Sequence, residues 1–241
     1  MVAFFHIARF LSREGFHSGT LEDSWINAII KTMPFSHLRP VPDVTDVSRE
    51  KTVQKRRAIF LDRDGTIIKQ VELLHEAKEI RMLPGAAAAI RAMNKLGYLV
   101  IMVSNQPVVA RGMISPEEVD RLNGIVVSRL KRQGARIDAS YFCPHHPKAN
   151  MEEYRMTCDY RKPGIGMFRD ASETFHIDLK KSFLVGDSTQ DVLAGNLAKV
   201  KTILVETGHG GKDPWQHEGK PEQVAKDLAG AVRFIKRQGA A

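Results

Sequence analysis

Two aspartates separated by a single residue open the motif Asp62-Arg63-Asp64-Gly65-Thr66, directly after a short apolar run. Paired carboxylates on a tight turn suit phosphoryl transfer through an aspartyl-phosphate. One carboxylate attacks phosphorus, and its neighbour protonates the leaving oxygen and then activates water. Taken alone, a motif of this kind is more often an ordinary acidic surface turn. Asp62 and Asp64 are therefore candidate catalytic residues whose role depends on support from elsewhere in the chain.

Four further polar residues follow later apolar runs and would complement the two aspartates. Ser104, in the sequence SNQ, could donate a hydrogen bond to a phosphate oxygen, and Lys162, in RKPG, could neutralise phosphate and nucleophile charge. Asp187, in GDSTQD, would complete a set of hard oxygen ligands for Mg²⁺. Asp191 would lie one helical turn behind it, in a position to support Lys162 or the waters of the metal. Each residue is a weak signal alone.

The elements that must position these residues alternate between strand and helix from residue 57 onward. Short apolar runs predict strands, and amphipathic segments opened by Ser or Pro and closed by Gly predict helices. The strands are expected at 57–62, 98–105, 139–143, 181–187 and 200–206, and the helices at 84–97, 115–134, 164–176, 189–199 and 222–239. This alternation predicts an α/β fold with a doubly wound parallel sheet, in which ligands bind beyond the carboxyl ends of the strands.

In this order the motifs resemble those of the haloacid dehalogenase superfamily of phosphohydrolases, over roughly residues 57–208. The matched pattern is D-x-D-G-T, then Ser, then Lys, then G-D-x-x-x-D. The resemblance implies that Asp62 is the nucleophile and Asp64 the general acid and base, with a backbone carbonyl of Asp64 on Mg²⁺. It also implies that Ser104 and Lys162 hold the phosphoryl group and that Asp187 is the second carboxylate on the metal.

The short intervals between these motifs leave no room for a large cap domain, which indicates the capless branch of the superfamily. The stretches IFLDRDGTI, SNQPVVARGMIS and CPHHP…RKPGIGM resemble the family of D-glycero-D-manno-heptose-1,7-bisphosphate 7-phosphatase and histidinol-phosphate phosphatase. That resemblance implies Mg²⁺-dependent hydrolysis of a small phosphorylated sugar, feeding nucleotide-activated heptose for surface glycans such as lipopolysaccharide. It also implies that Asn105, Arg111 and Arg161 contact substrate.

The loop 143–162 carries an incomplete metal-binding pattern. In the family it holds a structural zinc on C-x-H…C-x-C, and this chain supplies Cys143, His145 and Cys158 but has Tyr160 at the fourth position. A closed zinc site needs four ligands. Three outcomes are open: His146 substitutes, water fills the gap, or Tyr160 packs elsewhere and zinc is absent.

Composition bears on the cellular location of the protein, on its domain organisation and on the alternative functions. The chain has 241 residues, a net charge of +8 and only two cysteines, and the low cysteine count favours a reducing compartment. Apolar runs such as YLVIMV (98–103) are too short to span a bilayer, and we expect a cytoplasmic monomer. Residues 1–56 are expected to be an N-terminal extension and linker of unknown role, and residues 57–241 the phosphatase domain. Histidinol-phosphate hydrolysis remains an alternative. A DNA 3′-phosphatase is disfavoured because no basic and aromatic groove pattern is present, and a non-catalytic binding module is disfavoured by the intact carboxylates.

Overall fold

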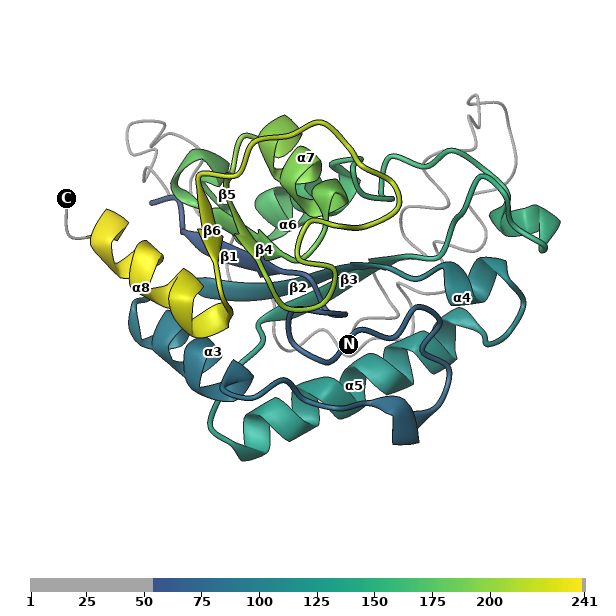
Figure 1. Ribbon diagram of the computed structural model, residues 1–241, viewed down its shortest axis with the longest axis horizontal. Helices are drawn as coiled ribbons and strands as arrows, with labels where there is room; N and C mark the ends of the chain where they lie inside the picture. The colour runs from purple at the N-terminus through teal and green to yellow at the C-terminus, as the bar shows by residue number, and fades with distance from the viewer. Residues whose placement is uncertain (1–53, 240–241) are drawn as a thin grey trace, which may run out of the picture. The chain divides into compact units, whose positions relative to one another are not determined.

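The computed structural model describes residues 54–239 (Figure 1). The extension and linker expected over residues 1–56 therefore lie outside the described residues, apart from residues 54–56. The described chain forms one six-stranded sheet in the order β3-β2-β1-β4-β5-β6, and every neighbouring pair of strands is parallel. The strands are β1 (Ala58–Leu61), β2 (Leu99–Asn105), β3 (Ala139–Cys143), β4 (Phe183–Gly186), β5 (Lys201–Val205) and β6 (Gln223–Ala225). The predicted α/β fold with a doubly wound parallel sheet is confirmed.

Helices cover both faces of the sheet, as the continuous apolar strands require. The α-helices are α3 (Ala86–Lys95), α4 (Pro107–Ala110), α5 (Pro116–Arg132), α6 (Gly166–Phe175), α7 (Thr189–Ala198) and α8 (Leu228–Gly239). Helices α3, α5 and α8 pack on one face, in the hydrophobic cluster that includes Ile59 and Val185. Helices α6 and α7 pack on the other face, around Phe60 and Leu184, and Figure 1 shows the two layers on opposite sides of the strands.

Strand β1, the first strand of the sheet in chain order, lies between β2 and β4, and this topology creates the ligand-binding edge. From β1 the chain moves outward through β2 and β3, and it then returns to pair β4 on the other side of β1. The connections leaving β1 and β4 therefore diverge at the carboxyl ends of adjacent strands, where open α/β sheets bind ligands. Strand β1 is buried along its whole length, which fixes its position between β2 and β4.

The prediction of the C-terminal helix was wrong in part. A single helix was expected over 222–239, whereas Gln223–Ala225 forms the edge strand β6 against β5 and the helix begins only at Leu228. The amphipathic pattern alone does not mark this break, because pairing with β5 is a tertiary interaction. Asp227 does mark it, since its carboxylate accepts a hydrogen bond from the Gly230 backbone N–H at 2.8 Å, as a helix-capping residue does.

The connections that approach the sheet edge contain little regular secondary structure. The described segment 62–85 contains one 3-10 turn, η1 (Ala77–Glu79), and the segment 144–165 contains another, η2 (Glu152–Tyr154). A third such turn, η3 (Leu179–Lys181), precedes β4. Neither of the first two segments forms a cap domain, as expected. Among the described residues, no helix combines the length and apolar character needed to cross a membrane.

Candidate active site

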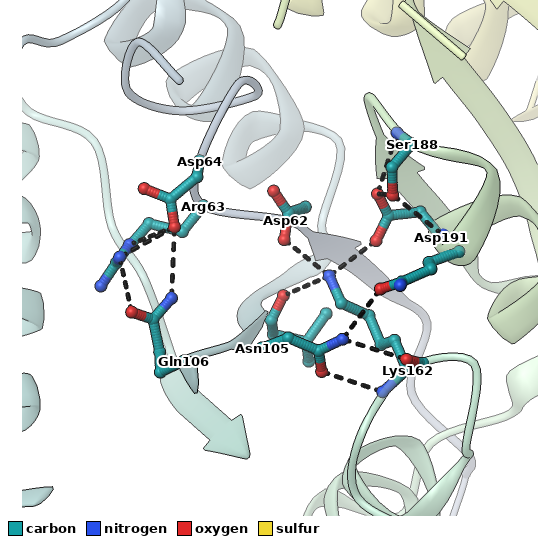
Figure 2. A network of polar contacts seen from close by, with 10 residues as sticks. Asp62, Arg63, Asp64, Asn105, Gln106, Lys162, Ser188 and Asp191 are labelled. Atoms are coloured by element: carbon teal, nitrogen blue, oxygen red, sulfur yellow. Dashed lines mark hydrogen bonds and ion pairs between the residues drawn. The ribbon is translucent and has the colours of Figure 1, made fainter. Parts of the chain in front are cut away.

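The parallel sheet brings the motif residues together at one edge. Asp62 follows β1, Ser104 lies near the end of β2, Asp187 follows β4, and Lys162 enters from the loop before α6. The Asp62 backbone N–H donates to the Val185 carbonyl at 3.0 Å, which holds the turn after β1 against the end of β4. The predicted convergence of these segments at one edge is therefore present in the structure, and Figure 2 shows Asp62 beside Lys162.

Lys162 is the centre of a buried network of charges. Its side chain is 3% exposed, and its ammonium group donates to Asp62 Oδ1 at 2.6 Å, Asp191 Oδ1 at 2.6 Å and the Val103 carbonyl at 3.1 Å. All three protons of the ammonium group are thus used. Burial disfavours the charged form, but the two carboxylates outweigh burial and raise the pKa of Lys162 above its ordinary value. Lys162 is therefore a permanent cation beside Asp62.

A capping box fixes the second carboxylate of that network. Asp191 Oδ2 accepts from both the backbone N–H and the hydroxyl of Ser188, at 3.1 Å and 2.6 Å, and the Ser188 hydroxyl in turn accepts from the Asp191 N–H. The start of α7 thus positions Asp191 to support Lys162, one of the two roles anticipated from the sequence.

The carboxylates at this edge carry more negative charge than Lys162 can offset. Burial raises the pKa of Asp62 to about 7, with Asp191 and Asp64 adding to the effect and Lys162 opposing it. Burial and the charges of Asp62 and Asp191 raise the pKa of Asp187 to about 8. Carboxylate oxygens of Asp62, Asp187 and Asp191 lie within 4.8 Å of one another. Such a crowded set of hard oxygen ligands fits a divalent cation of the Mg²⁺ type.

Two glycines make the close approach to Asp187 possible. A Cβ atom at Gly65 would lie 2.2 Å from Asp187 Oδ2, and one at Gly208 would lie 2.1 Å from the same oxygen. Both glycines have positive φ angles, of 76° and 59°. The backbone N–H of His209 also donates to Asp187 Oδ2. The loops after β1 and β5 therefore enclose Asp187 and hold it toward Asp62.

Asp64 belongs to a separate network, which the sequence did not indicate. Its Oδ2 accepts hydrogen bonds from Arg63 and from Gln106, whereas Asp62 is bonded to Lys162 (Figure 2). Arg63 is 1% exposed and also reaches Asn123 on α5. Only the position of Arg63 between the two aspartates, and of Gln106 directly after Ser104 and Asn105, could have suggested these partners.

The side chains of Ser104 and Asn105 differ in their hydrogen-bond partners. The Ser104 hydroxyl is buried and has no hydrogen-bond partner in the part of the chain that the structure describes, as expected for a donor reserved for a ligand. The Asn105 amide instead bonds within the protein: it accepts from the Lys162 backbone N–H at 2.9 Å and donates to the Lys162 carbonyl and to Gln190, both at 3.0 Å. Asn105 therefore anchors the backbone that carries Lys162.

The two arginines expected near substrate lie on the segments that follow β2 and β3. Arg111 is exposed at the end of α4, and Arg161 is half-buried, with Nη1 donating to the His145 carbonyl at 3.1 Å. Burial lowers the pKa of His146, and the charges of Arg161 and Arg111 lower it further. The charges of both arginines therefore act on the same imidazole.

The cysteine loop brings together three of the four expected zinc ligands. Donor atoms of Cys143, His145 and Cys158 lie within 4.8 Å of one another, and Cys143 Sγ is 3.6 Å from His145 Nδ1. Tyr160 instead donates its hydroxyl to Asp170. His146 Nδ1 accepts from the Lys148 backbone N–H at 3.0 Å. The cluster fits zinc only as a three-residue site.

Comparison with known proteins agrees with this geometry. A family model described as HAD-hydrolase-like, where HAD denotes haloacid dehalogenase, matches residues 159–231. The chain is 40% identical to the D-glycero-beta-D-manno-heptose-1,7-bisphosphate 7-phosphatase of Photorhabdus laumondii, over 75% of this chain and 97% of that protein. It is 44% identical to the enzyme of the same name from Rhodopseudomonas palustris, over 63% of this chain and 84% of that protein.

Solved structures give the same relationship. The D,D-heptose 1,7-bisphosphate phosphatase from B. bronchiseptica, crystallised with magnesium and phosphate, superposes with a TM-score of 0.66 at 30% identity, covering 76% of this chain and 99% of that chain. The identity and coverage of these relatives are high enough to assign a family. The chain is therefore a HAD-like phosphatase, and it belongs to the D-glycero-beta-D-manno-heptose-1,7-bisphosphate 7-phosphatase family.

Proposed function

We propose that this protein removes the 7-phosphate from D-glycero-beta-D-manno-heptose 1,7-bisphosphate in a Mg²⁺-dependent reaction. One observation carries the proposal: the buried Asp62–Lys162–Asp191 network lies beside Asp187 at the sheet edge. It does so in a chain that is 40% identical to a phosphatase of that name over 97% of that enzyme's length. The product would supply a heptose 1-phosphate for nucleotide activation and surface glycan synthesis.

The proposed metal site uses Asp62, Asp187 and the backbone carbonyl of Asp64. The raised pKa values of Asp62 and Asp187 support this site, because a divalent cation would offset the charge that makes their ionised forms costly here. When bound, Mg²⁺ would neutralise charge on the phosphate and so allow an anionic nucleophile to approach it.

The proposed chemistry proceeds in two steps on this chain's own residues. A carboxylate oxygen of Asp62 forms a bond to phosphorus while the bond to the sugar oxygen breaks. The electron pair stays on that oxygen, which takes a proton from Asp64. Water then attacks phosphorus and gives a proton to Asp64, and the Asp62 carboxylate and inorganic phosphate are released. Lys162 and the free hydroxyl of Ser104 are proposed to hold the phosphoryl oxygens.

Substrate recognition is proposed to depend on the two arginines of the segments that follow β2 and β3. Arg111 and Arg161 would bind the second phosphate, because guanidinium groups pair with phosphate through two parallel hydrogen bonds. Asn105 would orient substrate indirectly, through the Lys162 backbone that it holds, and any direct contact stays a proposal. The loop 143–162 would act as the scaffold that places Arg161, with or without zinc on Cys143, His145 and Cys158.

A cytoplasmic monomer, with its catalytic domain in residues 57–241, completes the proposal. The chain has only two cysteines, too few for a disulfide framework, and this supports a reducing compartment. Size-exclusion chromatography with light scattering tests the monomer directly, and a dimer mass would contradict it.

The function is tested by measuring phosphate release from three substrates, with and without Mg²⁺. These are heptose 1,7-bisphosphate, histidinol phosphate and DNA with a 3′-phosphate. We expect kcat/KM to be highest for the heptose substrate, only with Mg²⁺, and the product to keep its 1-phosphate. Comparable values for all three substrates would refute the substrate assignment while leaving the phosphatase class intact.

A further inference from the structure

Arg63 is a fully buried cation whose ionic partner is the candidate acid rather than the nucleophile. Its Nε and Nη2 donate to Asp64 Oδ2 at 3.0 Å and 2.8 Å, and the Arg63 side chain is 1% exposed. Burying a guanidinium is costly, and a hydrophobic side chain of similar volume would stabilise the fold as well or better. The position of this arginine therefore points to a role in arranging Asp64.

Two amides hold the guanidinium in place. Nη1 donates to Asn123 Oδ1 on α5 at 2.8 Å, and Nη2 donates also to Gln106 Oε1 at 2.8 Å. Gln106 completes the arrangement by donating from Nε2 to Asp64 Oδ2 at 3.2 Å. Because Asn123 lies on a helix that packs in the core, the orientation of Arg63 is tied to the rigid part of the fold.

The consequence for Asp64 is an asymmetry between its two carboxylate oxygens. Oδ2 accepts three hydrogen bonds, two from Arg63 and one from Gln106, whereas Oδ1, itself a buried atom, has no hydrogen-bond partner among residues 54–239. The oxygen without donors is the one on which a proton can reside without displacing a hydrogen bond. The network thus fixes the carboxylate in one orientation and distinguishes its two oxygens.

We propose that Arg63, supported by Gln106 and Asn123, is a positioning residue that orients Asp64 and leaves Oδ1 as the oxygen that carries the transferred proton. In the first step the proton leaves Oδ1 for the sugar oxygen as its bond to phosphorus breaks. In the second step the attacking water returns a proton to the same oxygen. The inference rests on the proposed function, in which Asp64 is the general acid and base.

The test compares two substrates that need the acid to different degrees. Heptose 1,7-bisphosphate releases a sugar alkoxide that must be protonated, whereas p-nitrophenyl phosphate releases a stable phenolate. The ratio of the two kcat/KM values therefore reports proton transfer, and defects in Asp62, Lys162 or the metal site lower both values together. We expect Arg63→Met to lower this ratio about 10²-fold, the loss typical of a catalytic group misplaced by roughly 1 Å.

Further variants separate positioning from folding. Arg63→Lys keeps the charge and should recover part of the ratio. Gln106→Met removes one donor to Asp64 and should lower the ratio about tenfold, the size of one hydrogen bond to a charged group. This variant keeps the inference testable if Arg63→Met fails to fold. Asn123→Ala removes only the outer support of Arg63 and should have the smallest effect.

Asp64→Asn separates failure of the inference from failure of the proposed function. If Asp64→Asn lowers the ratio and the Arg63 and Gln106 variants do not, the positioning role is wrong and the proposed function stands. Equal losses on both substrates in the Arg63 and Gln106 variants would also overturn the inference, because they indicate a general structural role. An unchanged ratio in Asp64→Asn would overturn the acid role and the inference together.

Discussion

Replacing Lys162 by Met removes the ammonium group that offsets Asp62 and Asp191 while keeping a side chain of similar length. Loss of one partner from a buried ion pair costs about 3–5 kcal/mol when the remaining charge stays uncompensated. Here the cost is limited, because Asp62 can take up a proton: its pKa is already about 7 with Lys162 present. Protonation of Asp62, rather than an uncompensated charge, should therefore determine the pH dependence of the variant.

The size of that dependence follows from the pKa of Asp62. At pH 6 the carboxyl group of the folded metal-free protein is largely protonated with or without Lys162, so the proton contributes almost nothing to the difference between the two proteins. At pH 8 the wild-type group is ionised, whereas the variant group, with its pKa raised further, stays protonated. Since one pKa unit corresponds to about 1.4 kcal/mol, Lys162→Met should lose on the order of 1 kcal/mol more unfolding free energy at pH 8 than at pH 6.

The assay is urea denaturation in EDTA at both pH values. Lys181→Met serves as the control, because Lys181 is 73% exposed and pairs with Asp178 at the surface, where an ion pair contributes at most about 1 kcal/mol. Phosphatase activity of Lys162→Met should fall about 10²–10³-fold, as for loss of a group that stabilises transition-state charge. An equal stability loss at pH 6 and pH 8, or a greater loss at pH 6, would refute the reasoning.

Three further predictions concern the metals. Mg²⁺ should raise the melting temperature more at pH 8 than at pH 6, because the raised pKa of Asp187 makes protons compete with the cation at low pH. An equal rise in melting temperature at both pH values would count against the proposed Mg²⁺ site. Gly65→Ala should weaken Mg²⁺ binding, measured by calorimetry, because the added Cβ atom would collide with Asp187. The control is Gly97→Ala, which should leave Mg²⁺ binding unchanged, because Gly97 has a similar φ of 79° but a Cβ atom there would have no neighbour within 4 Å. Tyr160→Cys should hold about one zinc per chain after dialysis and the wild type less, by elemental analysis; equal zinc in both would show that three ligands suffice.

The convergence of Asp62, Ser104, Lys162 and Asp187 could be predicted because it follows from local patterns. Each residue follows an apolar run or an expected loop, and a parallel sheet brings the carboxyl ends of its strands to one edge. The catalytic roles of these residues stay predictions until the variants are measured. The alternation of strands and helices gave the fold class in the same way.

The Arg63 network could not be predicted, because it depends on packing between segments far apart in the sequence. Asn123 lies on α5, and nothing in the local pattern of that helix indicates a contact with Arg63. For Gln106, which follows β2, the one signal is its position directly after Ser104 and Asn105. The same limit explains β6, whose residues carry an amphipathic pattern that suits a helix until pairing with β5 is considered. The hydrogen bond from Tyr160 to Asp170 could not be predicted either, because it depends on where α6 packs.

Trapping the phosphorylated intermediate tests the central claim most directly. Borohydride reduces an aspartyl-phosphate to homoserine, so quenching the enzyme during turnover of heptose 1,7-bisphosphate and reducing it marks the nucleophile for peptide mass spectrometry. We predict homoserine at residue 62 in the wild type, with no modification and no phosphate release in Asp62→Asn. Homoserine at Asp64 or Asp187, or full turnover by Asp62→Asn, would contradict the account.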